Sequence, residues 1–140
     1  MDYIQWEDSF HVGVEAFDKD HKFLVKLINN LHSGLMAGFG VSEMTYILDD
    51  LVRYTNVHFK REEDMMRKYS YPGFYEHEAA HAELVSRVLD FQSQIKSGKK
   101  VFSVELMSFL RDWLINHILK TDMLYSEFFR QRVQEGPARQ

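Results

Sequence analysis

The sequence has no cysteine, only two prolines, no long apolar run and no block of like charges. Without cysteine, disulfides, thiolate zinc sites, iron–sulfur clusters and thiol catalysis are excluded, and any metal must be bound by histidine or carboxylate. No apolar run approaches the ~20 residues of a membrane span. The N-terminal MDYIQWEDSF carries acids where a signal peptide needs basic and then apolar residues. We therefore expect a soluble, cytoplasmic protein.

Charge is spread evenly along the chain. The 17 basic and 21 acidic side chains are interspersed and leave a net charge of -4, so neither nucleic acid nor an anionic membrane is an expected partner. The 140 residues fit one domain, which can bury roughly two thirds of the surface of the unfolded chain. Because there is no repeat, low-complexity tract or linker, we predict a single domain over residues 1–140.

Four segments have the apolar spacing of one-sided helices. Short connections between them favour an all-α fold, an antiparallel up-down-up-down four-helix bundle. The apolar-studded N-terminus predicts an arm along this bundle, and the polar C-terminus predicts a frayed tail. The predicted helices cover about 18–35, 42–68, 74–97 and 103 onward, with the arm at about 1–17 and the tail at about 135–140.

The ends of these helices carry recognisable signals. Ser42 and Ser103 stand where N-caps are expected, and Gly98 stands where the third helix should stop. Residues 71–73, Tyr-Pro-Gly, predict the turn between the second and third helices.

Five of the seven histidines lie on the apolar faces of the predicted helices. Any one of them alone is more often a hydrogen-bonded core residue than a metal ligand. The five histidines together are a different case. The starts of the first and third helices and the ends of the second and fourth, where these histidines lie, meet at one end of an antiparallel bundle. Burying five imidazoles there without a metal would be costly. We therefore predict a metal site that contains His21, His58, His77, His81 and His117.

Two acids are expected to join these histidines. Glu62 follows His58 by four residues, so both side chains project to the same side of the helix. Asp122 follows His117 by five residues, which is about 140° round on an ideal α-helix. Two local structures would bring Asp122 to the site: a π-type widening of the helix, or the end of regular helix there.

The other polar residues near these positions are predicted to lie outside the site. Glu63 and Asp64 point elsewhere on the second helix and are expected to be solvated. His32 lies roughly 16 Å along the helix from His21, and His11 belongs to the arm. Both histidines are expected at the surface or at a second level of the core.

Seven donors are too many for one zinc ion, which takes about four ligands. Imidazole and carboxylate without sulfur suit iron, zinc or manganese, and the abundance of histidine favours iron. Two six-coordinate ions have about 12 positions, of which five imidazoles and two bridging carboxylates fill about nine. A bridging oxygen fills about two more. One position stays open on one ion, where a small molecule can bind.

The motifs HFKRE at 58–62, HEAAH at 77–81 and HILKTD at 117–122, together with His21, resemble those of the hemerythrins, particularly the single-domain bacterial hemerythrins. The resemblance extends from Trp6 through the YPGF turn to Asp122. It implies a non-haem di-iron centre that binds dioxygen reversibly, as an oxygen carrier, store or sensor.

The resemblance also implies roles for individual residues. His77, His81 and His117 would hold the saturated iron, and His21 and His58 the open one. Glu62 and Asp122 would bridge the two irons, together with an oxo or hydroxo group. The apolar oxygen pocket would comprise Leu24, Phe59, Trp113, Leu114 and Ile118, although ordinary core packing explains each of these side chains equally well.

HEAAH also matches the H-E-x-x-H signature of zinc metalloproteases. The extended metzincin motif requires glycine and histidine where this chain has Leu84 and Arg87. An all-helical chain also has no edge strand to hold a peptide substrate. We therefore reject the protease interpretation and expect Glu78 to face solvent.

A redox-active di-iron protein is the stronger alternative. It would store iron, or oxidise or scavenge peroxide or nitric oxide. Ferritin-like centres use about four carboxylates, whereas nitrogen dominates here, so we expect reversible binding rather than an enzyme. A sensor is a third possibility, in which LYSEFFRQRV at 124–133 forms a partner or subunit surface or packs on its own bundle.

Overall fold

The computed structural model describes residues 3–99 and 102–135, with only the backbone described at 118–119 and 132–135. All regular structure in these ranges is helical, which confirms the predicted fold class. The elements are η1 (Asp8–Phe10), α1 (Glu15–Ala37), α2 (Val41–Lys68), α3 (Phe74–Lys96), α4 (Val104–Asn116), the π-helical segment η2 (His117–Asp122) and α5 (Met123–Glu135).

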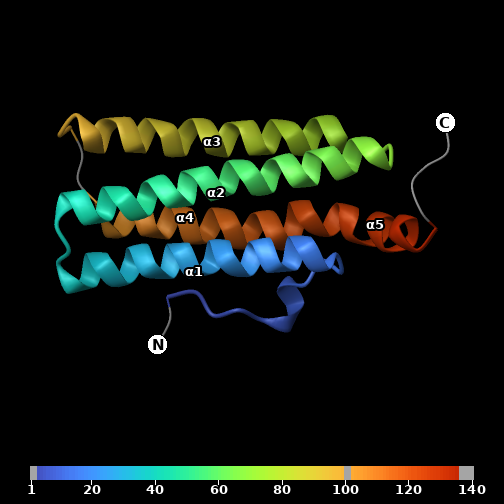
Figure 1. The fold of residues 1–140 in the computed structure, drawn as a ribbon, viewed down its shortest axis with the longest axis horizontal. Helices are drawn as coiled ribbons and strands as arrows, with labels where there is room; N and C mark the ends of the chain where they lie inside the picture. Colours follow the sequence, from blue (N-terminus) through green and yellow to red (C-terminus); the bar gives the residue numbers. More distant parts are fainter. Residues whose placement is uncertain (1–2, 100–101, 136–140) are drawn as a thin grey trace.

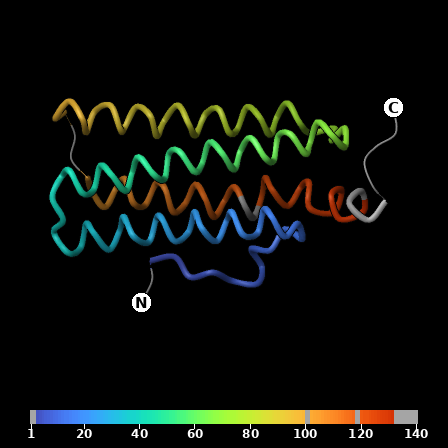
Figure 2. The backbone as a smooth tube through the Cα atoms, viewed as in Figure 1, coloured from blue at the N-terminus to red at the C-terminus, as the bar shows by residue number. Residues whose placement is uncertain are grey.

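Helices α1 to α4 lie side by side in an antiparallel bundle (Figure 1). The α1–α2 connection, the end of α3 and the start of α4 lie at one end, and the α2–α3 turn lies at the other end together with α5. The N-terminal arm runs back along α1, and α5 leaves the line of α4 beyond the π segment (Figure 2). The starts of α1 and α3 and the ends of α2 and α4 therefore share one end, as the prediction of the metal site requires.

The helix ends agree with the sequence signals in part. Ser103 caps α4, because its Oγ accepts a hydrogen bond from the Leu106 N–H (3.2 Å), and Gly98 (φ 79°) follows the end of α3. The prediction for Ser42 was wrong: Gly40 is the N-cap of α2, its carbonyl accepts from the Met44 N–H (3.0 Å), and no side chain caps it. Helix α1 begins three residues earlier than predicted, and most of the predicted tail lies outside the described residues.

Replacing Ser103 with alanine is expected to lower the free energy of unfolding by about 1 kcal/mol, because the Leu106 N–H loses its capping acceptor. Ser42→Ala is the matched control. Ser42 is exposed, lies inside α2 and makes no capping bond, so its replacement should change stability by less than about 0.5 kcal/mol. Denaturant titration of both variants measures the difference, and equal effects would show that the Ser103 cap is not stabilising.

The arm and α5 close the end of the bundle that holds the histidines. Asn29 fixes the arm by exchanging two hydrogen bonds with the Ile4 backbone (2.7 and 2.8 Å). Tyr125 and Phe129 of α5 are fully buried, and both make ring contacts with Phe17 of α1. The aromatic residues beyond Asp122 therefore pack on their own bundle. None of the described helices is long and apolar enough to cross a membrane.

Candidate metal centre

The structure brings all seven predicted donors together in the bundle interior, and we call them the histidine–carboxylate cluster. They come from α1, α2, α3 and the π segment that continues α4. All four helices of the bundle therefore contribute to the cluster. Each of the seven is at most 5% exposed. The cluster consists of His21, His58, Glu62, His77, His81, His117 and Asp122.

Asp122 turns one carboxylate oxygen toward each side of the cluster. Its Oδ1 lies 2.8 Å from His117 Nε2 and 3.1 Å from His77 Nε2. Its Oδ2 lies 3.1 Å from His21 Nε2. A single carboxylate therefore faces two separate sets of imidazole nitrogens.

Glu62 repeats this arrangement from α2. Its Oε1 lies 3.1 Å from His81 Nε2 and 3.6 Å from His77 Nε2. Its Oε2 lies 3.3 Å from His58 Nε2 and 3.6 Å from His21 Nε2. The two carboxylates thus divide the imidazoles in the same way, with three histidines on one side and two on the other.

The π segment explains how Asp122 reaches the cluster. On an ideal α-helix the fifth residue after His117 would point about 140° away. The i→i+5 winding of residues 117–122 returns Asp122 over His117. Of the two local structures that the sequence left open, the π-type widening is the one observed.

Many polar atoms of the cluster lack hydrogen bonds although their neighbours are close. His117 Nε2 and Asp122 Oδ1 lie 2.8 Å apart, yet Asp122 Oδ1 has no hydrogen bond. Buried polar atoms are almost always paired, so an unpaired group of this size indicates donors that converge on a shared centre, as metal ligands do. The described atoms in question are His21 Nδ1 and Nε2, His58 Nε2, Glu62 Oε1, His77 Nε2, and Asp122 Oδ1 and Oδ2.

The charges of the cluster compensate one another without a metal. Burial opposes a charge on His21, but the carboxylates of Asp122 and Glu62 outweigh it and raise the pKa of His21 to about 10. The pKa of His77 is raised to about 9 in the same way. Burial alone would raise the pKa of both acids, yet the surrounding histidines hold the pKa of Glu62 and that of Asp122 below their usual values. Without a metal cation, protonated histidines therefore supply the positive charge that balances the two carboxylates.

Comparison with known proteins shows the family of this chain. The family model of the hemerythrin HHE cation binding domain matches residues 12–129. This chain belongs to the hemerythrin family.

Relatives and solved hemerythrin structures match over most of their lengths. A bacteriohemerythrin from Methylococcus capsulatus is 38% identical over 83% of this chain and 88% of its own. A myohemerythrin from Theromyzon tessulatum is 31% identical over 86% of this chain and 89% of its own. A wild-type hemerythrin crystal structure superposes with a TM-score of 0.85 at 35% identity and covers 91% of this chain and 98% of that one.

Three further residues make hydrogen bonds to the histidine–carboxylate cluster, and the sequence did not predict them. Asp20 is buried and accepts a hydrogen bond from His58 Nδ1 (2.8 Å). Tyr125 is buried and its hydroxyl donates to Glu62 Oε2. Glu63 accepts from His81 Nδ1 (2.9 Å), so its predicted solvation was wrong.

The predicted positions of the other polar residues outside the cluster are confirmed. Asp64 is exposed and pairs with Arg67 (3.4 Å). The side chain of Glu78 is 41% exposed and also pairs with Arg67 (3.3 Å). His11 is exposed, and half-buried His32 stacks on Tyr3 of the arm (ring centroids 4.0 Å apart).

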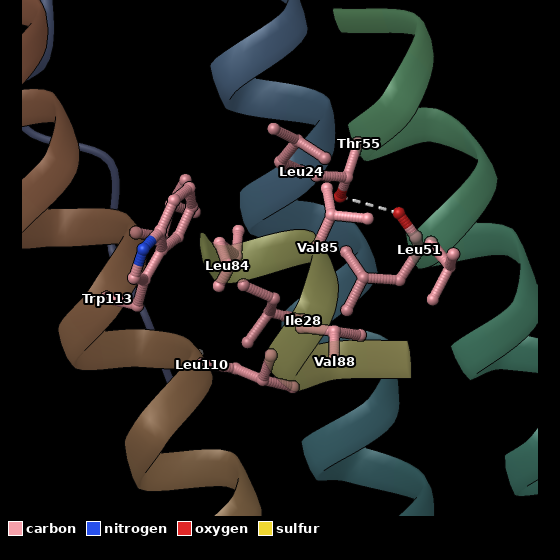
Figure 3. A pocket seen from close by; sticks show the side chains of 11 residues that line it. Leu24, Ile28, Leu51, Thr55, Leu84, Val85, Val88, Leu110 and Trp113 are labelled. Carbon is pink, nitrogen blue, oxygen red and sulfur yellow. Dashed lines mark hydrogen bonds between the residues drawn. The ribbon is translucent and has the colours of Figure 1, made fainter. Parts of the chain in front are cut away.

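An apolar cavity of about 30 Å³ lies one helical turn from the cluster, among α1, α2, α3 and α4. Among its described lining residues, only Thr55 and Trp113 carry polar side-chain atoms, and the Thr55 hydroxyl donates its hydrogen to the Leu51 carbonyl (2.7 Å; Figure 3). A cavity of this kind has room for a very small molecule and few polar partners to hold water. The lining is Leu24, Ile28, Leu51, Val52, Thr55, Leu84, Val85, Val88, Leu110, Trp113 and Leu114.

The predicted oxygen pocket overlaps this cavity in part. Leu24, Trp113 and Leu114 line it. Phe59 instead stacks on His81 (ring centroids 3.7 Å, interplanar angle 3°), so it covers an imidazole of the cluster. The side chain of Ile118 lies outside the described residues.

Proposed function

We propose that this hemerythrin-family chain binds dioxygen reversibly at a pair of non-haem irons. The main support is the division of the cluster, in which the two oxygens of each carboxylate face different sets of imidazole nitrogens. This arrangement suits carboxylates that bridge two ions. When bound, an iron pair supplies the two electrons that dioxygen takes on binding and returns on release.

In this proposal the two histidine sets have unequal roles. The set of three, His77, His81 and His117, fills one iron position. The set of two, His21 and His58, leaves the other position with room for dioxygen. Glu62 and Asp122, with an oxo or hydroxo group, bridge the two positions.

The surroundings of the cluster favour binding over turnover. Five imidazoles and two carboxylates form a donor set poorer in carboxylate than the ferritin-like centres. Trp113 stacks on His117 (interplanar angle 13°) as Phe59 stacks on His81, and the neighbouring cavity has an apolar lining. These side chains keep water from the cluster, which protects bound dioxygen from loss and the irons from irreversible oxidation.

Repeated oxygen cycling tests this proposal. The metal-free protein is loaded with ferrous iron under argon, and oxygen is added and removed several times while the visible spectrum is recorded. An absorption band that appears with oxygen and disappears under argon over many cycles supports reversible binding. One-way oxidation with consumption of oxygen would contradict it and favour the redox-active alternative, an iron store or a scavenging oxidase.

Iron loading at pH 7 is expected to release at least two protons per chain. His21 and His77, with pKa values of about 10 and about 9, are protonated at pH 7 in the metal-free protein, and a ligand nitrogen must be deprotonated. Release should fall as the pH rises through 9 to 10, because these protons have then already left. Calorimetric titration in buffers of different ionisation enthalpy measures the number, and loading without proton release at pH 7 would contradict the expected charge state.

A further inference from the structure

The Nδ1 atoms of two cluster histidines, one in each set, are bound by carboxylates. His58, in the set of two, donates to Asp20 (2.8 Å), and His81, in the set of three, donates to Glu63 (2.9 Å). Because a carboxylate only accepts, each ring carries a proton on Nδ1, and its Nε2 faces the cluster as the nitrogen available to a metal. A carboxylate in this position also makes the metal-facing nitrogen a stronger donor.

Asp20 shares its negative charge with other groups. Besides His58 it accepts a hydrogen bond from the Tyr54 hydroxyl (2.8 Å) and one from the Arg61 guanidinium (2.8 Å). The Asp20 side chain is 2% exposed and that of Arg61 is 50% exposed. The guanidinium therefore neutralises Asp20 from the surface, and less of its charge is available to polarise His58.

Glu63 has no such partner. Lys60 and Arg67, which line the same surface groove as Glu63, pair with Asp64 instead (both 3.4 Å). Among the side chains that the structure describes, no lysine or arginine forms an ion pair with Glu63, and the Glu63 side chain is only 18% exposed. No described ion pair therefore competes with the His81 ring for the carboxylate of Glu63.

From this difference we infer that Glu63 is a positioning residue whose uncompensated charge strengthens His81 as a ligand, so that the three-histidine position binds metal more tightly than the two-histidine position. This inference rests on the proposed two-metal site. The two carboxylates would then make the two metal positions unequal before any oxygen binds. Arg61 contributes by weakening the corresponding effect of Asp20 on His58.

Cobaltous ion is a suitable probe, because it reports binding by its visible spectrum without the oxidation that affects ferrous iron. The wild-type protein should bind two ions in two steps of different affinity. Glu63→Gln retains an acceptor for His81 Nδ1 but loses the charge, so it should weaken the tighter step by about 10- to 100-fold. Glu43→Gln, an exposed acid in the first turn of α2 at the other end of that helix, is the matched control and should leave both steps unchanged.

Arg61→Gln tests the same idea with the opposite sign. Removal of the guanidinium frees the charge of Asp20 to act on His58, so the weaker step should tighten toward the stronger one. A merely structural role for Arg61 would weaken binding or leave it unchanged. This variant also keeps the inference testable if Glu63→Gln does not fold, which thermal unfolding of the metal-free protein would reveal.

The two levels of the proposal fail in different ways. Fewer than two cobaltous ions bound by the wild-type protein would contradict the two-metal site itself. If Glu63→Gln bound both ions with the same affinities as the wild-type protein, the role of Glu63 would be contradicted but the two-metal site would not. A weaker step that is unchanged or weakened further in Arg61→Gln would overturn the inference that Arg61 limits the effect of Asp20 on His58.

Discussion

Replacing Glu62 with alanine is expected to reduce the bound iron from two ions per chain to one or none. Glu62 turns one oxygen toward His81 and the other toward His58, so its removal takes a donor from both metal positions. Elemental analysis after anaerobic loading with ferrous iron and desalting measures the iron content. This effect should be among the largest of any single substitution, because few other side chains face both histidine sets.

Glu78→Ala is the matched control for this experiment. Glu78 lies within the HEAAH motif, but its side chain is 41% exposed and pairs with Arg67 at the surface. The Glu78 variant should retain two irons. Retention of two irons by the Glu62 variant would show that Glu62 does not bridge, and loss of iron from the Glu78 variant would revive a role for the acid of the protease-like motif.

Removing the metal is expected to lower the midpoint of thermal unfolding by about 15 °C. Each ion present at about 100 times its dissociation constant stabilises the folded state by about 2.7 kcal/mol. Two ions therefore contribute about 5 kcal/mol, and a chain of this length shifts by about 3 °C for each kcal/mol. The metal-free cluster also leaves buried nitrogen and oxygen atoms without hydrogen bonds. Calorimetry of the iron-loaded and chelator-treated protein under argon measures the shift.

The Glu62→Ala protein is the control for chelation. Chelation should lower its midpoint by at most about half as much as in the wild-type protein, because it binds one iron or none. Wild-type midpoints within about 2 °C of each other, with and without iron, would contradict a metal that stabilises the fold.

The bundle and the level of the cluster could be predicted from the sequence because both follow from periodicity. Apolar spacing defines which face of each helix is buried, and the antiparallel order decides which helix ends meet. The five-residue step from His117 to Asp122 even predicted an irregularity, since a regular helix could not present both side chains. Periodicity does not distinguish a π segment from a helix end, and this choice required the structure.

The partners of the cluster were harder to predict because they are contacts between helices. His58 and Asp20 are separated by 38 residues, and His81 and Glu63 by 18. A signal for Asp20 did exist: it falls between Phe17 and Leu24 on the apolar face of α1, and a charge on a buried face requires a partner. Glu63 lies at the border of the apolar face of α2, where periodicity does not decide between solvent and a neighbouring helix.

Anomalous diffraction at the iron edge, from crystals grown with ferrous iron under argon, tests the central claim most directly. Two peaks about 3.5–4 Å apart are predicted, one among His77, His81 and His117 and the other beside His21 and His58. Glu62 and Asp122 should each contact both peaks. A single peak, or two peaks that share neither carboxylate, would contradict the account.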